Sequence, residues 1–134
     1  MEVSIREFRK DDAIPLAFLS SDDWAEKITF LAASLKNYDG QIVRCFVADG
    51  NDGIVGFIYG YILPDKLLIP EFLYVIPKYR KNGIAAQLLN TLEKESDCTA
   101  SMIFYNKSLR EHYQKQGYLV GDNLEVAMKQ LRIL

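Results

Sequence analysis

One stretch in the second half of the chain restricts the possible folds more than any other. Residues 67–76 are rich in β-forming and apolar side chains, and the apolar period becomes helical after Gly83. Leu88 and Leu92 lie on the apolar stripe of this helix, and a second β-rich run follows at residues 100–105. A strand, a helix and a strand within about 40 residues predict a right-handed parallel crossover.

The stretch before it predicts an antiparallel meander. Two β-rich runs, residues 42–48 and 54–63, flank a segment dense in turn-forming residues at 49–53. This pattern is typical of a hairpin, and the run at 67–76 adds a third strand. Pro70 cannot donate to a strand ladder, so it indicates a bulge or an edge position in that strand.

The first 35 residues predict one strand and two helices. Val3 and Ile5 alternate with polar residues, as in a short half-buried strand. Asp11 and Asp12 then open a short helix. Apolar residues at helical spacing predict a second amphipathic helix over residues 20–35.

The last third of the chain predicts a helix and a closing strand. Ser108 and Glu111 have the spacing of a capping box, and Gly117 suits the C-terminal cap of the same helix. Residues 124–128 alternate as a strand does. The complete order is β-α-α-β-β-β-α-β-α-β, which predicts an α/β fold with a central mixed sheet flanked by helices.

The length of the chain fits one domain. It has 134 residues, against about 100 to 200 for a typical domain. Hydrophobic residues make up 49% and charged residues 25%, which is the composition of a globular protein rather than of a disordered or disulfide-stapled one. We therefore expect a single domain over residues 1–134 that folds without a metal or a disulfide.

The charge of the chain is unevenly distributed. The net charge is −2, which disfavours a protein built mainly to coat nucleic acid. Residues 1–67 carry 7 basic and 11 acidic side chains, whereas residues 68–134 carry 9 and 7. An anion site is therefore expected in the second half, and no nucleic-acid partner is expected.

The cysteines and the hydropathy pattern bear on metal binding and location. Cys45, Cys98 and the single histidine, His112, cannot form a recognisable zinc set, so no metal is expected. Residues 1–6 lack the apolar run of a signal peptide, and the apolar stretch at 53–64 is too short to span a bilayer. We expect a cytoplasmic protein with reduced thiols and no membrane partner.

The turn that leads into the helix after Gly83 has the chemistry of an anion site. Lys78, Arg80 and Lys81 are positive, and no acidic residue lies between Glu71 and Glu93. The free N–H groups and the dipole of a helix N-terminus also favour a phosphate. A single glycine excludes the Walker and dinucleotide fingerprints. Spacing alone leaves a solvated loop as the alternative.

The sequence resembles the GNAT superfamily of N-acetyltransferases at this turn and at a second block. Residues 80–85, Arg-Lys-Asn-Gly-Ile-Ala, match the acetyl-CoA loop pattern Arg/Gln-x-x-Gly-x-Gly/Ala. Residues 73–77, Leu-Tyr-Val-Ile-Pro, match the strand that leads into that loop. The block from Asn106 to Tyr118 is similar to the family's Asn-x6-Tyr-x-Lys-x-Gly-Phe/Tyr stretch. Two blocks in the right order are more specific than either alone.

The resemblance implies direct acetyl transfer from acetyl-CoA to a primary amine, in a ternary complex without a covalent enzyme intermediate. The pantetheine arm of coenzyme A would fill a gap between the strands at 73–75 and 102–105. Backbone amides of the turn would hold the pyrophosphate, and the Val75 amide would bind the thioester carbonyl. The cofactor-binding residues implied in this way are Leu73, Tyr74, Val75, Arg80, Lys81, Asn82, Gly83, Ile84, Ala85, Ala86, Asn106 and Tyr113. Asn106 could instead cap a helix, and both roles are compatible.

The resemblance also implies a general acid, and the strand pattern indicates a base. Tyr113 matches the position of the family's frequent general acid, which protonates the departing thiolate; the alternative is a core aromatic that packs with Leu109. Glu71 lies two residues before Leu73, which predicts the same strand face and a role as base. A solvated edge-strand carboxylate is the alternative for Glu71, and His112 is expected on the helix surface.

The acceptor is less constrained than the cofactor. The acidic first half, with Asp22 and Asp23, would suit a cationic small-molecule or peptide amine. Tyr59 and Tyr61 could line its pocket, as could Tyr74, although strand aromatics often serve sheet packing.

Two alternative functions and the oligomeric state stay open. One alternative is a non-catalytic acyl-CoA-binding regulatory module. The other is an aminoglycoside-type acetyltransferase, which the Tyr-Ile-Leu-Pro stretch at 61–64 suggests. A homodimer is also left open, because members of the family are often dimers.

Overall fold

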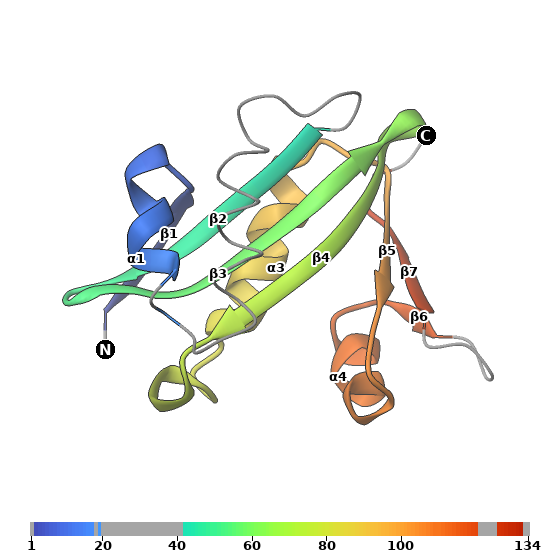
Figure 1. Cartoon of the computed structure of the whole chain (residues 1–134). Coiled ribbons are helices and arrows are strands. Elements are labelled where there is room, and N and C mark those ends of the chain that lie inside the picture. Colours follow the sequence, from blue (N-terminus) through green and yellow to red (C-terminus); the bar gives the residue numbers. More distant parts are fainter. Residues whose placement is uncertain (1, 18, 20–41, 121–125, 133–134) are drawn as a thin grey trace.

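The protein is built on one seven-stranded mixed sheet, in the order β1-β2-β3-β4-β5-β7-β6 (Figure 1). The computed structural model describes residues 2–17, 19, 42–120 and 126–132. The strands are β1 (Val3–Glu7), β2 (Ile42–Gly50), β3 (Gly53–Leu63), β4 (Leu67–Val75), β5 (Ala100–Phe104), β6 (Leu119–Val120) and β7 (Val126–Gln130). The helices are α1 (Ala13–Ala17), α3 (Ile84–Glu95) and α4 (Arg110–Lys115).

The predicted α/β class, the meander and the crossover are confirmed. β2, β3 and β4 pair antiparallel in sequence order, and β4 and β5 are parallel with α3 between them. The short strand β6 was not predicted, because two residues are too few to show alternation. The helix predicted over residues 20–35 lies outside the described residues. Within the described part of the chain, no helix combines the length and apolar character needed to cross a membrane.

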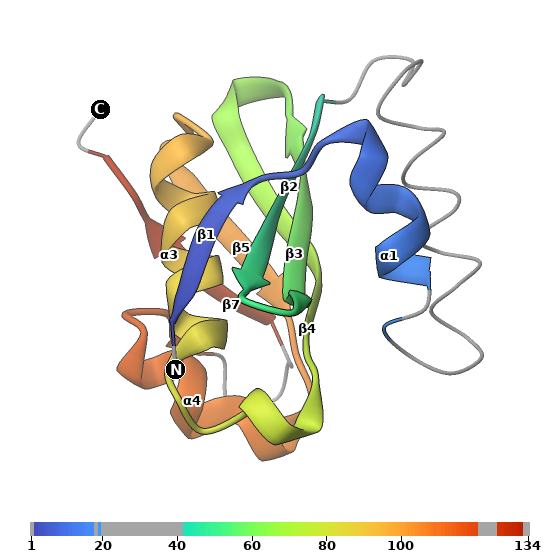
Figure 2. The same cartoon turned by 90° about the vertical axis from the view of Figure 1, so that its left-hand side faces the viewer.

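Helices cover the two faces of the sheet (Figure 2). α3 packs on one face through Leu88, Leu89 and Leu92, which belong to the larger core cluster. α1 lies on the opposite face, where Leu16 packs into a second cluster with Phe57. The apolar stripe of α3 therefore supplies the buried face that its helical period predicts.

The start of α4 differs from the prediction. Ser108 does not cap the helix with its side chain; instead its backbone N–H donates to the side chain of Asn106 at 3.2 Å. A 3₁₀ turn, Lys107–Leu109, then leads into α4. The predicted C-terminal cap is confirmed, since Gly117 has a φ of 92°. The sequence alone could not show that Asn106, and not Ser108, provides the cap, because both residue types favour the N-cap position.

The pairing of β4 with β5 ends after two residue pairs. Leu67 is opposite Ala100 and Leu68 is opposite Ser101, and no further pair joins these strands. Figure 1 shows the two strands meeting at one end of the sheet and separating toward α4. Both strands continue beyond the last pair, so the sheet opens between them as the family resemblance implies.

A β-bulge interrupts β4 at Glu71. Tyr59 is opposite Phe72 and Gly60 is opposite Pro70, which leaves Glu71 without a partner across the ladder. The proline thus marks a bulge, as the sequence indicates. A Cβ atom at Gly60 would lie 2.8 Å from the carbonyl oxygen of Ile69, so only glycine fits opposite this bulge.

An arginine and two aspartates hold the N-terminal segment on the sheet. Arg6 forms a two-pronged contact with Asp12, with both N···O distances 2.9 Å, and its Nε donates to Asp49 at 3.0 Å. The Arg9 backbone N–H donates to Asp12 at 2.7 Å. Hydrogen bonds from Arg6 hold the pKa of the buried Asp12 carboxyl below its usual range.

We expect Asp12→Asn to lower the free energy of unfolding at pH 7 by about 2 kcal/mol, because a charge-assisted contact is lost. A lowered native pKa stabilises the fold above the unfolded-state pKa, and this stabilisation is lost as the pH falls through the native value. The difference from wild type in a denaturant titration should therefore shrink below about pH 4. Asp11→Asn, at the exposed neighbouring residue, is the control. A difference that stays constant down to pH 2 to 3, roughly, would contradict the assignment.

Candidate active site

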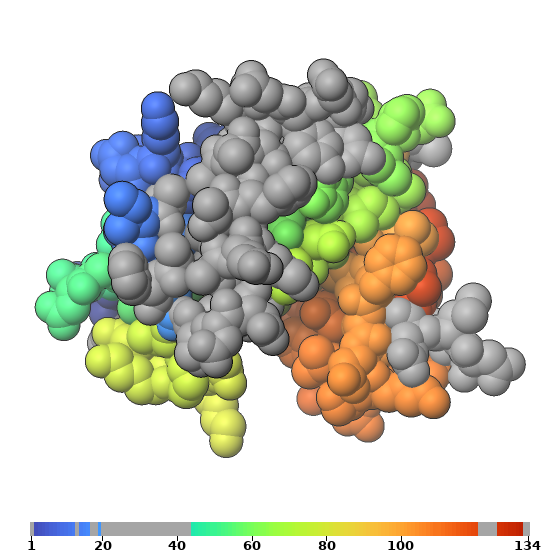
Figure 3. All heavy atoms as spheres, viewed as in Figure 1, coloured from blue at the N-terminus to red at the C-terminus, as the bar shows by residue number. Residues whose placement is uncertain are grey.

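A pocket of about 240 Å³ opens where β4 and β5 separate. The space-filling view shows a notch between the loop that follows β4 and the segment around α4 (Figure 3). β4 forms one wall, and β5 with α4 forms the other. The lining residues are Ile58, Pro70, Glu71, Phe72, Leu73, Leu89, Ile103, Phe104, Tyr105, Asn106, Leu109 and Tyr113.

The wall formed by β4 presents backbone groups that β3 does not use. The N–H of Ile76 donates to the carbonyl of Val55 at 2.9 Å, while Val75 is opposite Gly56. In an antiparallel ladder this makes Val75 a non-hydrogen-bonded position, whose N–H and C=O point away from the partner strand. Leu73, two residues before Val75 and opposite Ile58, is a non-hydrogen-bonded position for the same reason. Both residues therefore turn their amides toward the gap that β5 has left.

The Arg80 side chain is hydrogen-bonded to the end of β4. Its Nε donates to the carbonyl of Val75 at 2.7 Å, and its guanidinium lies 5.4 Å from the ring centroid of Tyr74. Tyr74 belongs to the cluster on the α1 face, so its side chain is on the other side of the sheet from Leu73. The sequence places the charge of Arg80 at the turn correctly, but it does not show that this side chain is bound to the strand.

The turn after Arg80 is held by its own backbone and one amide side chain. Lys81 and Gly83 have φ values of 64° and 78°. The Nδ2 of Asn82 donates to the carbonyl of Arg80 at 3.0 Å and to that of Tyr79 at 3.2 Å. Asn82 is exposed, and its side-chain amide binds carbonyls of the loop and so helps to fix the loop's shape.

The N-terminus of α3 leaves backbone donors free. The first bond along the helix runs from the N–H of Gln87 to the carbonyl of Gly83 at 3.1 Å. The amides of Ile84, Ala85 and Ala86 precede it and have no partner within the helix. A Cβ atom at Gly83 would meet no atom of the described residues within 4 Å, so the space beside this glycine is open. The arrangement suits a phosphate, as the sequence predicts.

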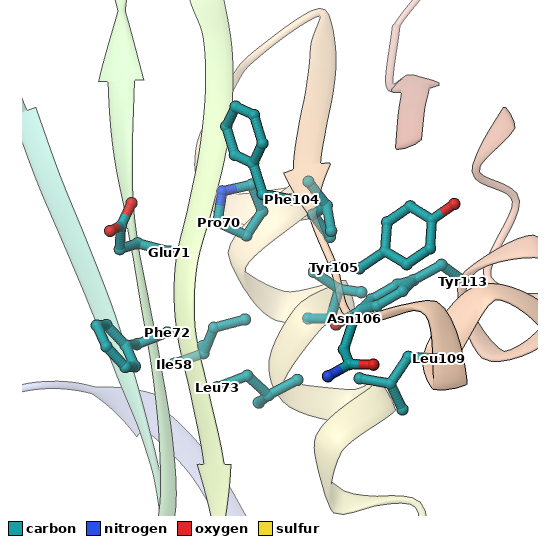
Figure 4. Close-up of a pocket in the computed structure, with 12 residues that line it drawn as sticks. Ile58, Pro70, Glu71, Phe72, Leu73, Phe104, Tyr105, Asn106, Leu109 and Tyr113 are labelled. Carbon is teal, nitrogen blue, oxygen red and sulfur yellow. The ribbon is translucent and has the colours of Figure 1, made fainter. Parts of the chain in front are cut away.

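Asn106 lies at the end of β5, on the wall opposite Leu73 (Figure 4). Its Oδ1 accepts hydrogen bonds from the N–H and the hydroxyl of Ser108, each at 3.2 Å. The capping role is therefore confirmed. Its Nδ2 makes no hydrogen bond with any residue in the described part of the chain, so one donor remains available in the pocket.

Tyr113 reaches from α4 into the pocket beside Tyr105 (Figure 4). It is 9% exposed, and its ring centroid lies 5.7 Å from that of Tyr105 and 5.9 Å from that of Tyr118. Its hydroxyl makes no hydrogen bond with a described residue. Burial raises the pKa of the phenol, so it keeps its proton at neutral pH. Tyr113 is thus a core aromatic whose protonated hydroxyl lies at the pocket.

The bulge changes the predicted face of Glu71. Figure 4 shows Glu71 and Phe72 on one side of β4, with Leu73 and Tyr113 on the other. Burial raises the pKa of the Tyr59 phenol, and the charge of Glu71 raises it further, which places the carboxylate near that ring. The expectation that Glu71 shares a face with Leu73 is therefore wrong, because the extra residue of the bulge reverses the alternation.

The single histidine and the two cysteines are the remaining side chains with reactive groups. His112 is half-buried, with its ring centroid 5.0 Å from that of Tyr113, so it is less exposed than expected. Cys45 and Cys98 are both buried free thiols. Burial raises the pKa of Cys45, which disfavours a nucleophilic thiolate.

A polar cluster behind α4 was not predicted from the sequence. Glu93, Ser101, Tyr118 and Lys129 are joined there by hydrogen bonds and a salt bridge. One indication was present, because Glu93 follows Leu89 by four residues and so continues the apolar stripe of α3. A carboxylate at a core position requires partners, and these come from β5, β7 and the residue after Gly117.

Comparisons with known structures show the same fold. PaiA N-acetyltransferase from Thermoplasma acidophilum, solved with coenzyme A, is 17% identical with a TM-score of 0.74, over 97% of this chain and 99% of that chain. The GNAT family N-acetyltransferase YhbS from Escherichia coli, solved with CoA, is 18% identical with a TM-score of 0.77, over 97% and 82%. A GNAT family acetyltransferase from Brucella melitensis, solved with acetyl-CoA, is 13% identical with a TM-score of 0.76, over 98% and 90%.

The sequence itself matches a family as well. None of the curated protein sequences matches the chain significantly. The family model for the acetyltransferase (GNAT) domain matches residues 41–120, which is more than half of the chain. The matched region runs from the meander through the turn and α3 to Tyr113 and includes both walls of the pocket. The chain therefore belongs to the GNAT family of acetyl-CoA-dependent N-acetyltransferases.

Proposed function

We propose that this protein moves the acetyl group of acetyl-CoA to a primary amine by direct attack in a ternary complex, with Tyr113 as general acid and Glu71 as base. One observation carries the proposal. On one wall of the pocket between β4 and β5 lie backbone amides that pair with no described strand, and on the other lies a buried phenol whose hydroxyl binds no described residue. These are the donors that acyl transfer from a thioester requires.

The residues present fit coenzyme A along the length of the gap. The free amides at the N-terminus of α3 would hold its pyrophosphate, with Lys81 exposed beside them. The backbone groups of Leu73 would pair with the pantetheine arm, since no described strand is hydrogen-bonded to them, and the Nδ2 of Asn106 would donate from the opposite wall. Acetyl-CoA supplies the activated thioester.

The Val75 amide would stabilise the negative charge that develops on the thioester carbonyl oxygen. Its N–H points into the gap, and Arg80 binds the carbonyl of the same residue at 2.7 Å. An amide that is held on a strand costs little reorganisation when charge develops on a nearby carbonyl oxygen. Arg80 thus contributes by fixing the strand end that carries this donor.

Tyr113 donates the proton that the departing thiolate needs. A phenol whose pKa is raised by burial is fully protonated at neutral pH, and its hydroxyl is not bound to another described group. The proton therefore goes to the leaving sulfur as its bond to the acetyl carbon breaks. A free donor in the pocket favours turnover over a purely regulatory acyl-CoA-binding module.

Glu71 and its neighbours suit a cationic acceptor. The carboxylate is exposed at the bulge, next to the rings of Tyr59 and Phe72, whose centroids are 5.3 Å apart. The ring of Tyr61 meets that of Tyr59 edge-on at 6.0 Å. A carboxylate beside aromatic faces attracts an ammonium group and can take its proton before attack, directly or through water. An aminoglycoside is one amine of this kind.

Two further expectations from the sequence concern the acceptor residues and the location of the protein. Asp22 and Asp23, whose charge would suit a cationic acceptor, lie outside the described residues. The free thiols suit the reducing cytoplasm that the sequence suggests.

A thiol-release assay with acetyl-CoA and a panel of amines would identify the acceptor. Inclusion of aminoglycosides, polyamines and lysine peptides in the panel separates the candidate classes.

We expect acetyl-CoA and coenzyme A to stabilise the fold. A ligand at about one hundred times its Kd adds about 2.7 kcal/mol to the free energy of unfolding. ATP should add much less, since it lacks the pantetheine arm that fills the pocket. A thermal-shift series measures this, and an ATP shift as large as that of coenzyme A would contradict the cofactor assignment.

We expect Arg80→Glu to weaken coenzyme A binding by roughly tenfold, because it removes the contact with Val75 and places a negative charge beside the phosphate site. Lys94→Glu makes the same charge change on the exposed face of α3, in its last turn, and should have little effect. Calorimetry at low and high salt measures both. Equal losses for the two variants would contradict a phosphate site at the turn.

We expect Tyr113→Phe to reduce kcat by about a hundredfold or more, because the proton donor is lost while the ring still packs. Affinity for acetyl-CoA and the melting temperature should change little. Thiol release and calorimetry on the one variant give all three quantities. Wild-type turnover in a stably folded Tyr113→Phe protein would exclude the general-acid role.

A further inference from the structure

The buried polar cluster behind α4 is not used by the chemistry described above. We propose that Glu93, Tyr118 and Lys129 are positioning residues that fix the end of α4 and thereby orient the Tyr113 hydroxyl in the pocket. The proposal rests on the proposed function, in which Tyr113 is the acid. It extends that function to three side chains on α3, β7 and the residue that follows Gly117.

Tyr118 is the centre of the cluster. It is 3% exposed, and its hydroxyl donates to the Oε2 of Glu93 at 2.6 Å and is hydrogen-bonded to the Oγ of Ser101 at 2.8 Å. Burial raises the pKa of this phenol, as does the Glu93 carboxylate, so it stays protonated and continues to donate. One hydroxyl thus joins the chain after α4 to α3 and to β5.

Lys129 joins the end of α4 to β7. Its Nζ donates to the backbone carbonyl of Gln116 at 2.5 Å and to the Oε1 of Glu93 at 3.2 Å. Gln116 follows the last residue of α4, where carbonyls lack helical partners and a cation is favoured. A Cβ atom at Gly117 would lie 3.1 Å from the Cε of Lys129, so glycine leaves the room that the lysine needs.

Tyr118 links the cluster to Tyr113 through a backbone hydrogen bond and a contact between the two rings. The N–H of Tyr118 donates to the carbonyl of Tyr113 at 3.0 Å. The rings of these two tyrosines meet edge-on, with an interplanar angle of 72°. α4 has six residues, too few to be stable by itself, so its orientation depends on such tertiary contacts. A shift of Tyr118 therefore moves the residue that carries the acid.

Buried hydrogen bonds suit this role because they are directional. An apolar contact tolerates sliding, whereas a carboxylate with two charged or polar donors fixes the distance between α3 and α4. Loss of one donor also leaves a buried polar group unsatisfied, so the structure shifts to restore it. Small displacements of a reacting group reduce rate steeply while binding is retained.

The test begins with Tyr118→Phe, which keeps the ring and removes only the hydroxyl. We expect kcat to fall about tenfold, with the acetyl-CoA Kd and the KM of the amine within roughly twofold of wild type. In the Tyr113→Phe background the same substitution should have no further effect on kcat, because the group that it orients is gone. Glu93→Gln, which can still accept from Tyr118, should keep more activity than Glu93→Leu.

Thr91→Val is the matched control. It also removes a hydroxyl from a hydrogen bond on α3, to the carbonyl of Gln87 at 2.8 Å, but on the exposed side of the helix. Its kcat should equal that of wild type. A Tyr118→Phe protein with a lower melting temperature and unchanged kcat would overturn the proposal, as would an equal fall of kcat in the Tyr113→Phe background.

A second measurement does not need turnover. Carbon NMR of protein labelled at tyrosine, with the Tyr113 resonance assigned by its loss in Tyr113→Phe, should show that resonance shifted in Tyr118→Phe. It should be unshifted in Thr91→Val. An unshifted resonance in Tyr118→Phe overturns the positioning role even if no amine proves to be a substrate. Failure of wild type to release thiol with any amine would instead contradict the proposed function.

Discussion

The site depends on the point at which β4 and β5 stop pairing. Only two residue pairs join these strands, and beyond Leu68 and Ser101 no strand of the described residues pairs with their facing edges. Unpaired backbone groups inside a protein require hydrogen bonds from elsewhere. At the end of β4, Arg80 provides one of them to the carbonyl of Val75. The remaining amides form a polar line along the gap, and a ligand with amide groups of its own can complete the sheet there.

Much of this could be predicted from the sequence, because the relevant determinants are local. The strand, the basic turn and the start of α3 follow one another within residues 73–86, so periodicity and charge describe them together. Glycine at position 83 has the positive φ expected of a turn that opens toward a ligand. The spaced block from Asn106 to Tyr118 singles out Tyr113, and the structure places this side chain in the lining of the pocket.

What the sequence could not show depends on contacts across the sheet. A bulge opposite Gly60 determines the sheet face on which the Glu71 side chain lies. The register of two paired strands depends on both of them, so the sequence of one strand does not reveal it. The contact of Arg80 with its own strand depends on a rotamer, which no motif encodes. The partners of Glu93 come from residues 25 and 36 positions further along the chain, beyond the range of any periodic pattern.

The small overlap between β4 and β5 also has a consequence for the order in which the chain folds. β2, β3 and β4 are consecutive hairpins, so their contacts close short loops. The contact of Leu68 with Ser101 closes a much longer loop and yields only a short ladder in return. We expect the meander to form early, with the segment from β5 to α4, which carries Asn106 and Tyr113, docking last. The region around the gap between β4 and β5 would then be the last part of the sheet to form.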